Sequence, residues 1–359
     1  MGRNCSTLSH FVSAGSPADV SPLRRLLPPL AGDAAVSILL ALLLLAAAHP
    51  AAALKPMHGY PAVPSDYGIV YEPLSVRTPD GVGLCVWFYP AQDTAGIAND
   101  LVGRLVPVPD SLKRAPARAP LGGAPGTARR APADRPPTVV IASGDAGNMT
   151  QNILYAYHLC TRGMNAVTFD WRGFGESDLW PAEGEMERDR LCYAEFLTDY
   201  AAVLDAIEQR PDVDPARIGL FGYSTGAYLS FSTAADRPEI AAFAGRALLT
   251  SFEDILPILR TVMPDRAFQA PEAYPDSLLP IRAAERVRIP VLLIVGEKDV
   301  RTPPWMSERI AEKLAGPKEV WIVPGAEHGG ANGPEFVDYP AFFVRVAQFF
   351  ERALAPARE

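Results

Sequence analysis

Cysteine and histidine are both scarce in this sequence. Four cysteines occur among 359 residues, at Cys5, Cys85, Cys160 and Cys192, and they form neither a C-x-x-C pair nor a cluster with histidine. This spacing excludes a disulfide-dense scaffold and argues against a structural zinc site. Removal of an N-terminal segment that contains Cys5 would leave an odd number of cysteines, so at least one thiol would stay free.

Positive charge is also in deficit. The chain carries 33 Lys and Arg against 41 Asp and Glu, which gives a formal net charge of −8. Nucleic-acid-binding domains carry a net basic footprint, so no nucleic-acid partner is expected. The sequence contains neither an H-E-x-x-H motif nor a phosphate-binding loop, and it therefore predicts no metal and no cofactor.

An apolar run follows the polar N-terminal segment. Residues 1–33 are polar and include the basic pair Arg24–Arg25, and the run extends from Ala34 to Ala48. It is shorter than the ~20 apolar residues of a membrane-spanning helix. Positive charge before the run and the small residues Ala51–Ala53 after it are typical of a signal peptide.

Three interpretations of residues 34–54 stay open: a signal peptide cleaved after Ala53, an uncleaved membrane anchor, or a buried core helix. Under either of the first two, the retained positive charge keeps the start of the chain inside. The rest is then exported, to the periplasm or the medium, or is tethered to the membrane outside the cytoplasm.

Residues 55–359 are predicted to form one domain with a long insertion. Alternating apolar residues at 74–78 and 84–89, separated by Pro79-Asp80-Gly81, indicate a β-hairpin. From about 95 to 137 the chain is rich in Pro, Ala and Arg and has no hydrophobic periodicity. Such a segment cannot bury enough apolar surface to offset its ordering entropy, so we expect a disordered insertion between two strands.

After residue 137, apolar strands alternate with helical patterns. This alternation predicts an α/β fold with a mostly parallel central sheet and helices on both faces. The near-continuous apolar run Val291–Val295 is typical of a strand that is buried on both sides. The expected strands are 138–142, 165–169, 217–221, 246–250, 291–295 and 319–323, and the expected helices are 149–162, 187–209, 225–236, 304–314 and 336–354.

The segment Gly222-Tyr223-Ser224-Thr225-Gly226 lies between an expected strand and an expected helix. In this setting the G-x-S-x-G motif holds a nucleophilic serine on a sharp, strained turn. Glycine is needed on both sides because a Cβ there would collide with the neighbouring strand and helix. Ser224 is therefore the candidate catalytic nucleophile.

A serine hydroxyl needs an adjacent base that is held by a third group. In chains with this motif the order is Ser, then Asp or Glu, then His. Of the five histidines only His328 follows Ser224, in a loop after the last expected strand. Asp299 directly follows the fifth expected strand, and it would orient the His328 imidazole and stabilise its protonated form. Two weaker candidates for the acid are Glu297 and Asp254.

The tetrahedral oxyanion of an acyl-transfer reaction needs backbone N–H donors that are in place beforehand. One is expected to be the amide of Thr225, directly after the nucleophile, and the other an amide in the loop after the first core strand. That loop, residues 143–148, is rich in glycine and precedes an expected helix. The second donor is assigned to Asp145, with Ala146 as the alternative.

Taken in order, these motifs resemble those of α/β-hydrolases over residues 136–350, and within that superfamily they are similar to the Bem46-like serine hydrolases. That group carries an H-G-N-A-G-N loop, a D-Y-R-G-Y-G-x-S turn, G-x-S-x-G, G-x-x-D and a terminal G-x-x-H. The matching segments are Ser143–Asn148, Asp170–Ser177, Gly222–Gly226, Gly296–Asp299 and Gly325–His328. The resemblance implies an α/β-hydrolase fold and a Ser-His-Asp triad.

The chain departs from that group at two positions of one loop. Ser143 stands where the group has His, and Asp145 stands where it has Asn. The expected donors are backbone amides, so the oxyanion hole can survive both changes. A carboxylate at Asp145 would hinder catalysis if it pointed inward, because it would lie near the developing oxyanion. Asp170 and Arg172 match a structural turn of the group and are expected to brace a loop.

The expected activity is hydrolysis of carboxylic ester or thioester bonds through an acyl-enzyme. Acyl transfer to an acceptor other than water uses the same triad and stays an alternative, as does a non-catalytic binding protein on a hydrolase fold. The expected partners are a small-molecule ester or an acyl lipid, and the membrane if the N-terminal segment is not cleaved.

Residues 252–288 can form only a small cap over the site. Its apolar residues either line an acyl pocket or pack as ordinary core. They are Leu256, Ile258, Leu259, Val262, Met263 and Phe268.

Overall fold

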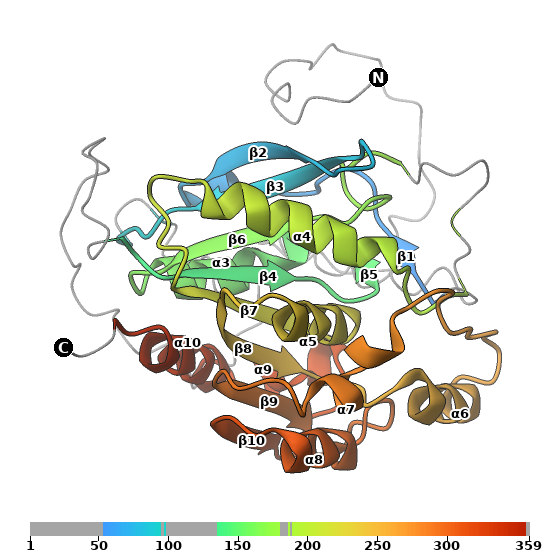
Figure 1. The fold of residues 1–359 in the computed structure, drawn as a ribbon. Helices are drawn as coiled ribbons and strands as arrows, with labels where there is room; N and C mark the ends of the chain where they lie inside the picture. Colours follow the sequence, from blue (N-terminus) through green and yellow to red (C-terminus); the bar gives the residue numbers. More distant parts are fainter. Residues whose placement is uncertain (1–52, 95–96, 98–134, 180–185, 187–188, 357–359) are drawn as a thin grey trace, which may run out of the picture.

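The computed structural model describes residues 53–94, 97, 135–179, 186 and 189–356, and their centre is an eight-stranded sheet in the order β10-β9-β8-β7-β4-β6-β3-β2 (Figure 1). The hairpin strands β2 (Glu72–Arg77) and β3 (Gly83–Tyr89) are antiparallel, and β3 also pairs antiparallel with β6 (Asn165–Phe169). All other neighbours in the sheet are parallel. They add the strands β4 (Thr138–Ala142), β7 (Ile218–Tyr223), β8 (Ile240–Arg246), β9 (Val291–Gly296) and β10 (Lys318–Val323).

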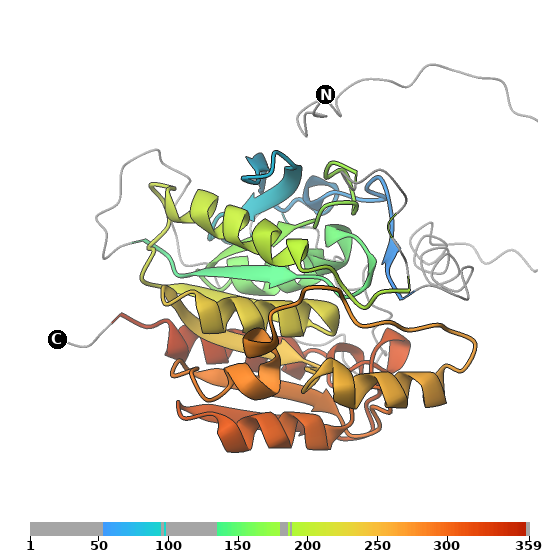
Figure 2. The ribbon, with the colours of Figure 1, turned by 45° about the vertical axis from the view of Figure 1, so that its right-hand side comes forward.

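Helices cover both faces of this sheet, as predicted (Figures 1 and 2). Successive side chains of a strand point to opposite faces, so Val140 belongs to one core and Val139 and Ile141 belong to the other. The first core packs on α4 (Glu195–Glu208), α5 (Thr225–Asp236), α7 (Pro280–Ala283) and α8 (Pro304–Lys313). The second packs on α3 (Ile153–Cys160) and α10 (Ala341–Ala353).

The loops that carry the candidate residues leave one edge of the sheet. Ser224 follows β7, Asp299 follows β9, His328 follows β10 and Asp145 follows β4. The carboxyl ends of parallel strands meet at a single edge, and open α/β sheets bind their ligands there. Residues that are far apart in the sequence are thereby gathered over neighbouring strands.

Short elements complete this edge. The strand β1 (Lys55–Pro56) pairs in parallel with β5 (Ala146–Gly147), which lies in the loop after β4. Helix α6 (Phe252–Val262) lies at the same end of the sheet as β1 in both views (Figures 1 and 2). The remaining short elements are η2 (Pro64–Tyr67), η5 (Met149–Asn152), η6 (Asp276–Leu278), η7 (Gly330–Asn332) and α9 (Pro334–Val337).

The fourth predicted strand is wrong. It was expected at 246–250, but β8 runs from Ile240 to Arg246. Alanine and glycine dominate β8 and have low strand propensity, so the segment has no strand pattern of its own. Pairing with β7 and β9 on its two sides makes it a strand. The apolar residues Leu248 and Leu249, which produced the wrong prediction, are buried in the loop that follows.

Two predicted helices have different bounds. The helix expected at 336–354 is divided into α9 and α10, because Pro340 lacks an N–H and disfavours helical backbone in the residue before it. The helix expected from 187 begins at Glu195. Among residues 189–194, the amide of Leu191 is bonded to Gln269 O instead.

Several predictions fall wholly or largely outside the described residues: the polar segment 1–33, the run at 34–54 and the insertion at 95–137. At their borders, Ala53, Leu54 and Ile97 are buried, and Arg135 Nη1 donates to Val213 O at 3.0 Å. None of the helices in the described ranges has the length and apolar character needed to cross a membrane.

Candidate active site

Ser224 lies on a strained turn between β7 and α5. Its φ of 53° and ψ of −118° are outside the regions that residues with a side chain commonly adopt. A Cβ on Gly222 would lie 2.3 Å from the Gly226 carbonyl oxygen, and a Cβ on Gly226 would lie 2.3 Å from that of Ser143. The turn therefore requires both glycines of the motif, for the steric reason that the sequence predicts.

The structure brings Ser224, His328 and Asp299 together. Ser224 Oγ lies 3.1 Å from His328 Nε2, and His328 Nδ1 lies 2.9 Å from Asp299 Oδ2. These hydrogen-bond distances follow the order of nucleophile, base and orienting acid that activates a hydroxyl. The His328 side chain is 16% exposed, whereas Asp299 is buried.

Donors from its own loop surround Asp299. The amides of Arg301 and Thr302 donate to Oδ1, each at 2.9 Å, and Thr302 Oγ1 donates to Oδ2 at 2.7 Å. Burial acts to raise the pKa of Asp299, but the hydrogen bond and the attraction to His328, with the Thr302 donors, hold that pKa below its ordinary value. An ionised Asp299 favours the tautomer in which Nδ1 carries the proton and Nε2 faces Ser224 as an acceptor.

The two weaker candidates for the acid are bonded elsewhere. Glu297 Oε2 accepts from the Gly325 amide at 2.8 Å, and Asp254 Oδ2 accepts from the Thr250 hydroxyl at 2.6 Å. Both carboxylates therefore stabilise loops, and Asp299 is the candidate that is hydrogen-bonded to His328.

Arg246, which the motifs did not single out, is hydrogen-bonded to the backbone of both His328 and Ser224. Its buried guanidinium donates from Nη1 to the His328 carbonyl oxygen at 2.5 Å, and Nη2 lies 3.3 Å from Glu335 Oε1. The guanidinium also lies 4.6 Å from the centroid of the Tyr223 ring. Its own carbonyl oxygen accepts from the Ser224 amide at 2.9 Å. The sequence signal that could have identified this position is a lone arginine in the apolar stretch 240–249.

The amides of Thr225 and Asp145 belong to residues that line one pocket with Ser224. Thr225 is the first residue of α5, and amides of the first turn have no acceptor within their own helix. Across the part of the chain that the structure describes, neither amide is bonded to an acceptor. The assignment of these two amides as oxyanion donors stays a prediction. Ala146, the alternative donor, lies in β5 and is not part of the pocket lining.

The segment after Leu54 braces the loop that carries Asp145. The Lys55 amide donates to Asp145 O at 2.7 Å, and the Met57 amide donates to Gly147 O at 2.9 Å. This support for the site was not predicted, because a parallel pairing of two residues leaves no periodic pattern in the sequence.

Asp170 connects three segments near this loop. Its Oδ1 accepts from the Met149 amide at 2.7 Å, at the start of η5, and its Oδ2 accepts from the Tyr60 hydroxyl at 2.8 Å. Complete burial raises the pKa of Asp170 to about 7. Asp170 therefore has the bracing position that the family resemblance implies.

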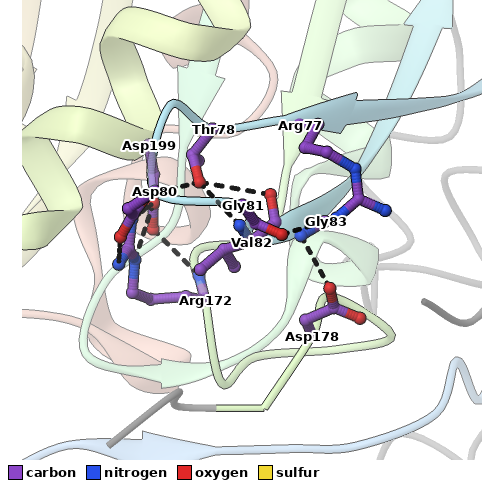
Figure 3. Close-up of polar contacts among 9 residues, drawn as sticks. All are labelled: Arg77, Thr78, Asp80, Gly81, Val82, Gly83, Arg172, Asp178 and Asp199. Carbon is purple, nitrogen blue, oxygen red and sulfur yellow. Dashed lines mark hydrogen bonds and ion pairs between the residues drawn. The ribbon is translucent and has the colours of Figure 1, made fainter. Parts of the chain in front are cut away.

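Arg172 lies between two aspartates from other elements (Figure 3). Nη1 is 2.6 Å from Asp80 Oδ2 in the β2–β3 turn, and Nη2 is 2.7 Å from Asp199 Oδ1 in α4. Arg172 and Asp199 are buried, whereas the Asp80 side chain is 46% exposed. Asp178 holds the same turn, because its Oδ2 accepts from the Gly83 amide at 2.7 Å. These contacts attach the hairpin turn to the loop after β6 and to α4.

The pocket beside Ser224 is partly apolar. Three of the six cap residues proposed for an acyl pocket line it, namely Leu259, Met263 and Phe268. The other three, Leu256, Ile258 and Val262, are outside the lining, and Val262 is exposed. Two arginines, Arg266 and Arg301, also line the pocket.

Known sequences resemble more than half of this chain. A model of the prolyl oligopeptidase family matches residues 151–356. The uncharacterized protein Rv2307c of Mycobacterium tuberculosis is 32% identical over 213 residues, which cover 59% of this chain and 69% of that protein.

Two solved structures have similar folds. A puromycin-hydrolyzing peptidase of Mycobacterium tuberculosis superposes with a TM-score of 0.57 at 18% identity, over 82% of this chain and 40% of that one. The esterase Pf2001 of Pyrococcus furiosus superposes with a TM-score of 0.56 at 15% identity, over 84% of this chain and 100% of that one. The predicted α/β-hydrolase fold is therefore confirmed, and the match spans less than half of the peptidase.

Proposed function

The chain belongs to the prolyl oligopeptidase family of serine hydrolases, and from this premise we propose that it cleaves carboxylic ester or thioester bonds. One observation carries the proposal: Ser224, His328 and Asp299 are hydrogen-bonded in series beside a pocket with an apolar wall. The five motifs in the order of the Bem46-like serine hydrolases favour that group within the α/β-hydrolase superfamily.

In the proposed reaction, Ser224 Oγ attacks the carbonyl carbon while His328 Nε2 takes the hydroxyl proton. The amides of Thr225 and Asp145 donate to the oxyanion. The intermediate then collapses and the bond to the alcohol or thiol breaks, with the leaving group taking the proton from His328. Water attacks the acyl-enzyme, again losing a proton to His328, and the carboxylic acid leaves as Ser224 regains its proton.

Peptide-bond hydrolysis is the second candidate. The matched family takes its name from oligopeptidases, and one structural neighbour is titled a puromycin-hydrolyzing peptidase. The charge of the pocket favours esters over substrates with a free α-amino group, because Arg266 and Arg301 line it and repel an ammonium. Turnover of p-nitrophenyl esters against aminoacyl p-nitroanilides separates the two candidates.

The test of the proposal is turnover of a p-nitrophenyl ester by wild type and Ser224→Ala. We expect kcat/KM to fall by about 10³-fold or more, as triad losses do, while the melting temperature changes little. Ser277→Ala, an exposed serine in η6, is the matched control and should retain wild-type turnover. Near-wild-type activity in Ser224→Ala would end the hydrolase proposal.

A further inference from the structure

Cationic side chains from two separate segments line the pocket, and a third cation, Lys55, lies in a strand bonded to the lining. Arg266, which follows α6, and Arg301, which follows β9, line the pocket together with Ser224 and His328. Lys55 lies in β1, where its backbone is bonded to Asp145 in the same lining. Strand β1 and helix α6 lie at one end of the sheet in both views (Figures 1 and 2).

These cations are close enough to act on one another. Burial lowers the pKa of Lys55 most, and repulsion from Arg266 and then from Arg301 adds to that effect, while Asp145 opposes it. Among the described residues, none of the three side chains has an ion-pair partner within 4.0 Å. Mutual repulsion at an unoccupied site is unfavourable, and an anion placed between the cations would relieve it.

What distinguishes these two arginines is their place beside Ser224. Among the described residues, Arg77, Arg260 and Arg286 also lack an ion pair and donate to backbone carbonyl oxygens, but they are not part of the pocket lining, whereas Arg266 and Arg301 are. The whole chain is acidic, with a formal net charge of −8, so unpaired cations do not follow from a general excess of positive charge. The pocket is therefore a local positive site on an acidic protein.

Apolar residues lie beside these cations. Leu259, Met263 and Phe268 line the pocket in the same part of the chain as Arg266, and the Arg266 guanidinium lies 5.7 Å from the centroid of the Phe268 ring. An apolar substrate chain that lay along this wall would end near the Arg266 guanidinium. The site thus combines a nucleophile, an apolar wall and positive charge.

We infer that the enzyme selects esters or thioesters that carry an apolar chain and an anionic group, a carboxylate or a phosphate, held by Arg266 and Arg301. The inference rests on the proposed function, because it names the substrate class of the same site. Among the described residues that line the pocket, Asp145 is the only carboxylate, and Lys55 beside it partly balances its charge. The lysine thereby also reduces the repulsion that Asp145 exerts on an oxyanion.

The first test compares matched esters with and without a carboxylate. In the acyl arm, the substrates are p-nitrophenyl hexanoate and the p-nitrophenyl monoester of adipic acid. In the leaving-group arm, they are the hexanoate esters of p-hydroxybenzoate and of its methyl ester. We expect the anionic member of at least one pair to have a kcat/KM about tenfold higher, since a hydrogen bond to a charged group contributes that much. Equal kcat/KM within both pairs would overturn the inference.

The second test uses variants and salt. Arg266→Gln and Arg301→Gln should each lower the anionic-to-neutral ratio of kcat/KM by about tenfold. Arg352→Gln, an exposed arginine near the amino ends of the strands, removes the same charge and should leave the ratio unchanged. Added salt should lower the ratio in wild type, since screening weakens partly exposed charge pairs. An anionic-to-neutral ratio of kcat/KM that neither the variants nor salt changes would contradict the inference.

A binding measurement separates this inference from the proposed function. Calorimetry on Ser224→Ala compares monomethyl adipate, which is anionic, with dimethyl adipate, which is neutral. We expect the anion to bind about tenfold more tightly, and Arg266→Gln in the same background to abolish the difference. An anion preference without any esterase activity would reject the hydrolase proposal and keep the anion site. Equal binding of both ligands would reject the anion site whatever the enzyme hydrolyses.

Discussion

Arg246 is hydrogen-bonded both to Ser224, the proposed nucleophile, and to His328, the proposed base. Its carbonyl oxygen holds the Ser224 amide, and its guanidinium holds the carbonyl oxygen of His328. Ser224, His328 and Asp299 were predicted from spacing and chain order, because the chemistry of the reaction constrains those residue types. Arg246 was not, because its role depends on a contact between β8 and a loop that lies 82 positions further along the chain.

We expect Arg246→Lys to lower kcat for a p-nitrophenyl ester by about 10²-fold with a smaller change in KM, since small displacements of a base have effects of that size. Lysine keeps the charge beside Glu335 but cannot reproduce the planar fork that also reaches His328 O. Steady-state kinetics with a melting curve make the measurement, and Arg352→Lys is the control. A kcat within twofold of wild type would show that Arg246 serves the fold alone.

The raised pKa of Asp170 predicts how the stability of the fold changes with pH. Its pKa is about 7 in the folded chain, raised by burial from an ordinary 3.8. Between these values the unfolded chain releases the proton while the folded chain keeps it, so the contribution of Asp170 to stability falls as pH rises from about 4 to 7.

Asp170→Asn removes this titration and imitates the protonated acid. The unfolding free energy of wild type relative to Asp170→Asn should therefore decrease by up to about 4 kcal/mol between pH 4 and pH 7, at about 1.4 kcal/mol per pKa unit. Urea denaturation across this range measures the difference, in which other titrating groups cancel. A difference that is flat with pH would mean that Asp170 ionises normally in the folded chain.

At the scale of elements, the parallel strands were the most predictable part of the fold. The apolar runs of β4, β6 and β9 are buried on both faces, and they lie where the sequence places them. β8 was misplaced because its alanines and glycine carry no strand signal and the neighbouring strands determine its position. The antiparallel hairpin was predicted from its alternation and turn, but its attachment to α4 through Arg172 was not.

Arg172→Met should destabilise the fold by about 3–5 kcal/mol, because it leaves the buried Asp199 without its partner. The double variant Arg172→Met with Asp199→Leu should recover most of that loss, since an apolar pair can replace a buried ion pair. Urea denaturation measures both. A loss below about 1 kcal/mol in the single variant would show that the pair in Figure 3 contributes little.

At the scale of the whole molecule, the N-terminal region determines whether the catalytic domain is exported, and export would expose the cysteines to an oxidising compartment. The predicted export of the catalytic domain stays a proposal, and the burial of the cysteines is compatible with it. Cys85, Cys160 and Cys192 are all buried, and burial raises the pKa of Cys160 and Cys192 to about 12, so these two thiols form little reactive thiolate.

The structure refines where processing would occur. Ala53 and Leu54 are buried in the first core, the one that packs on α4 and α5, so cleavage directly after Ala53 would remove a packed residue and place a new ammonium group at a buried position. We therefore expect any mature chain to begin upstream of Ala53. Cell fractionation with N-terminal sequencing measures this. Full-length protein in the soluble cytoplasmic fraction would contradict export, and a mature folded chain that begins at Leu54 would contradict the refinement.

The most direct test of the account is the site at which a fluorophosphonate probe attaches. Peptide mapping by mass spectrometry after labelling should place the adduct on Ser224 in wild type, with no adduct in Ser224→Ala and much slower labelling in His328→Ala, because the base activates the hydroxyl. Ser277→Ala should be labelled at the wild-type rate. An adduct on another residue, or equal labelling of wild type and Ser224→Ala, would contradict the assignment of this site as the catalytic centre.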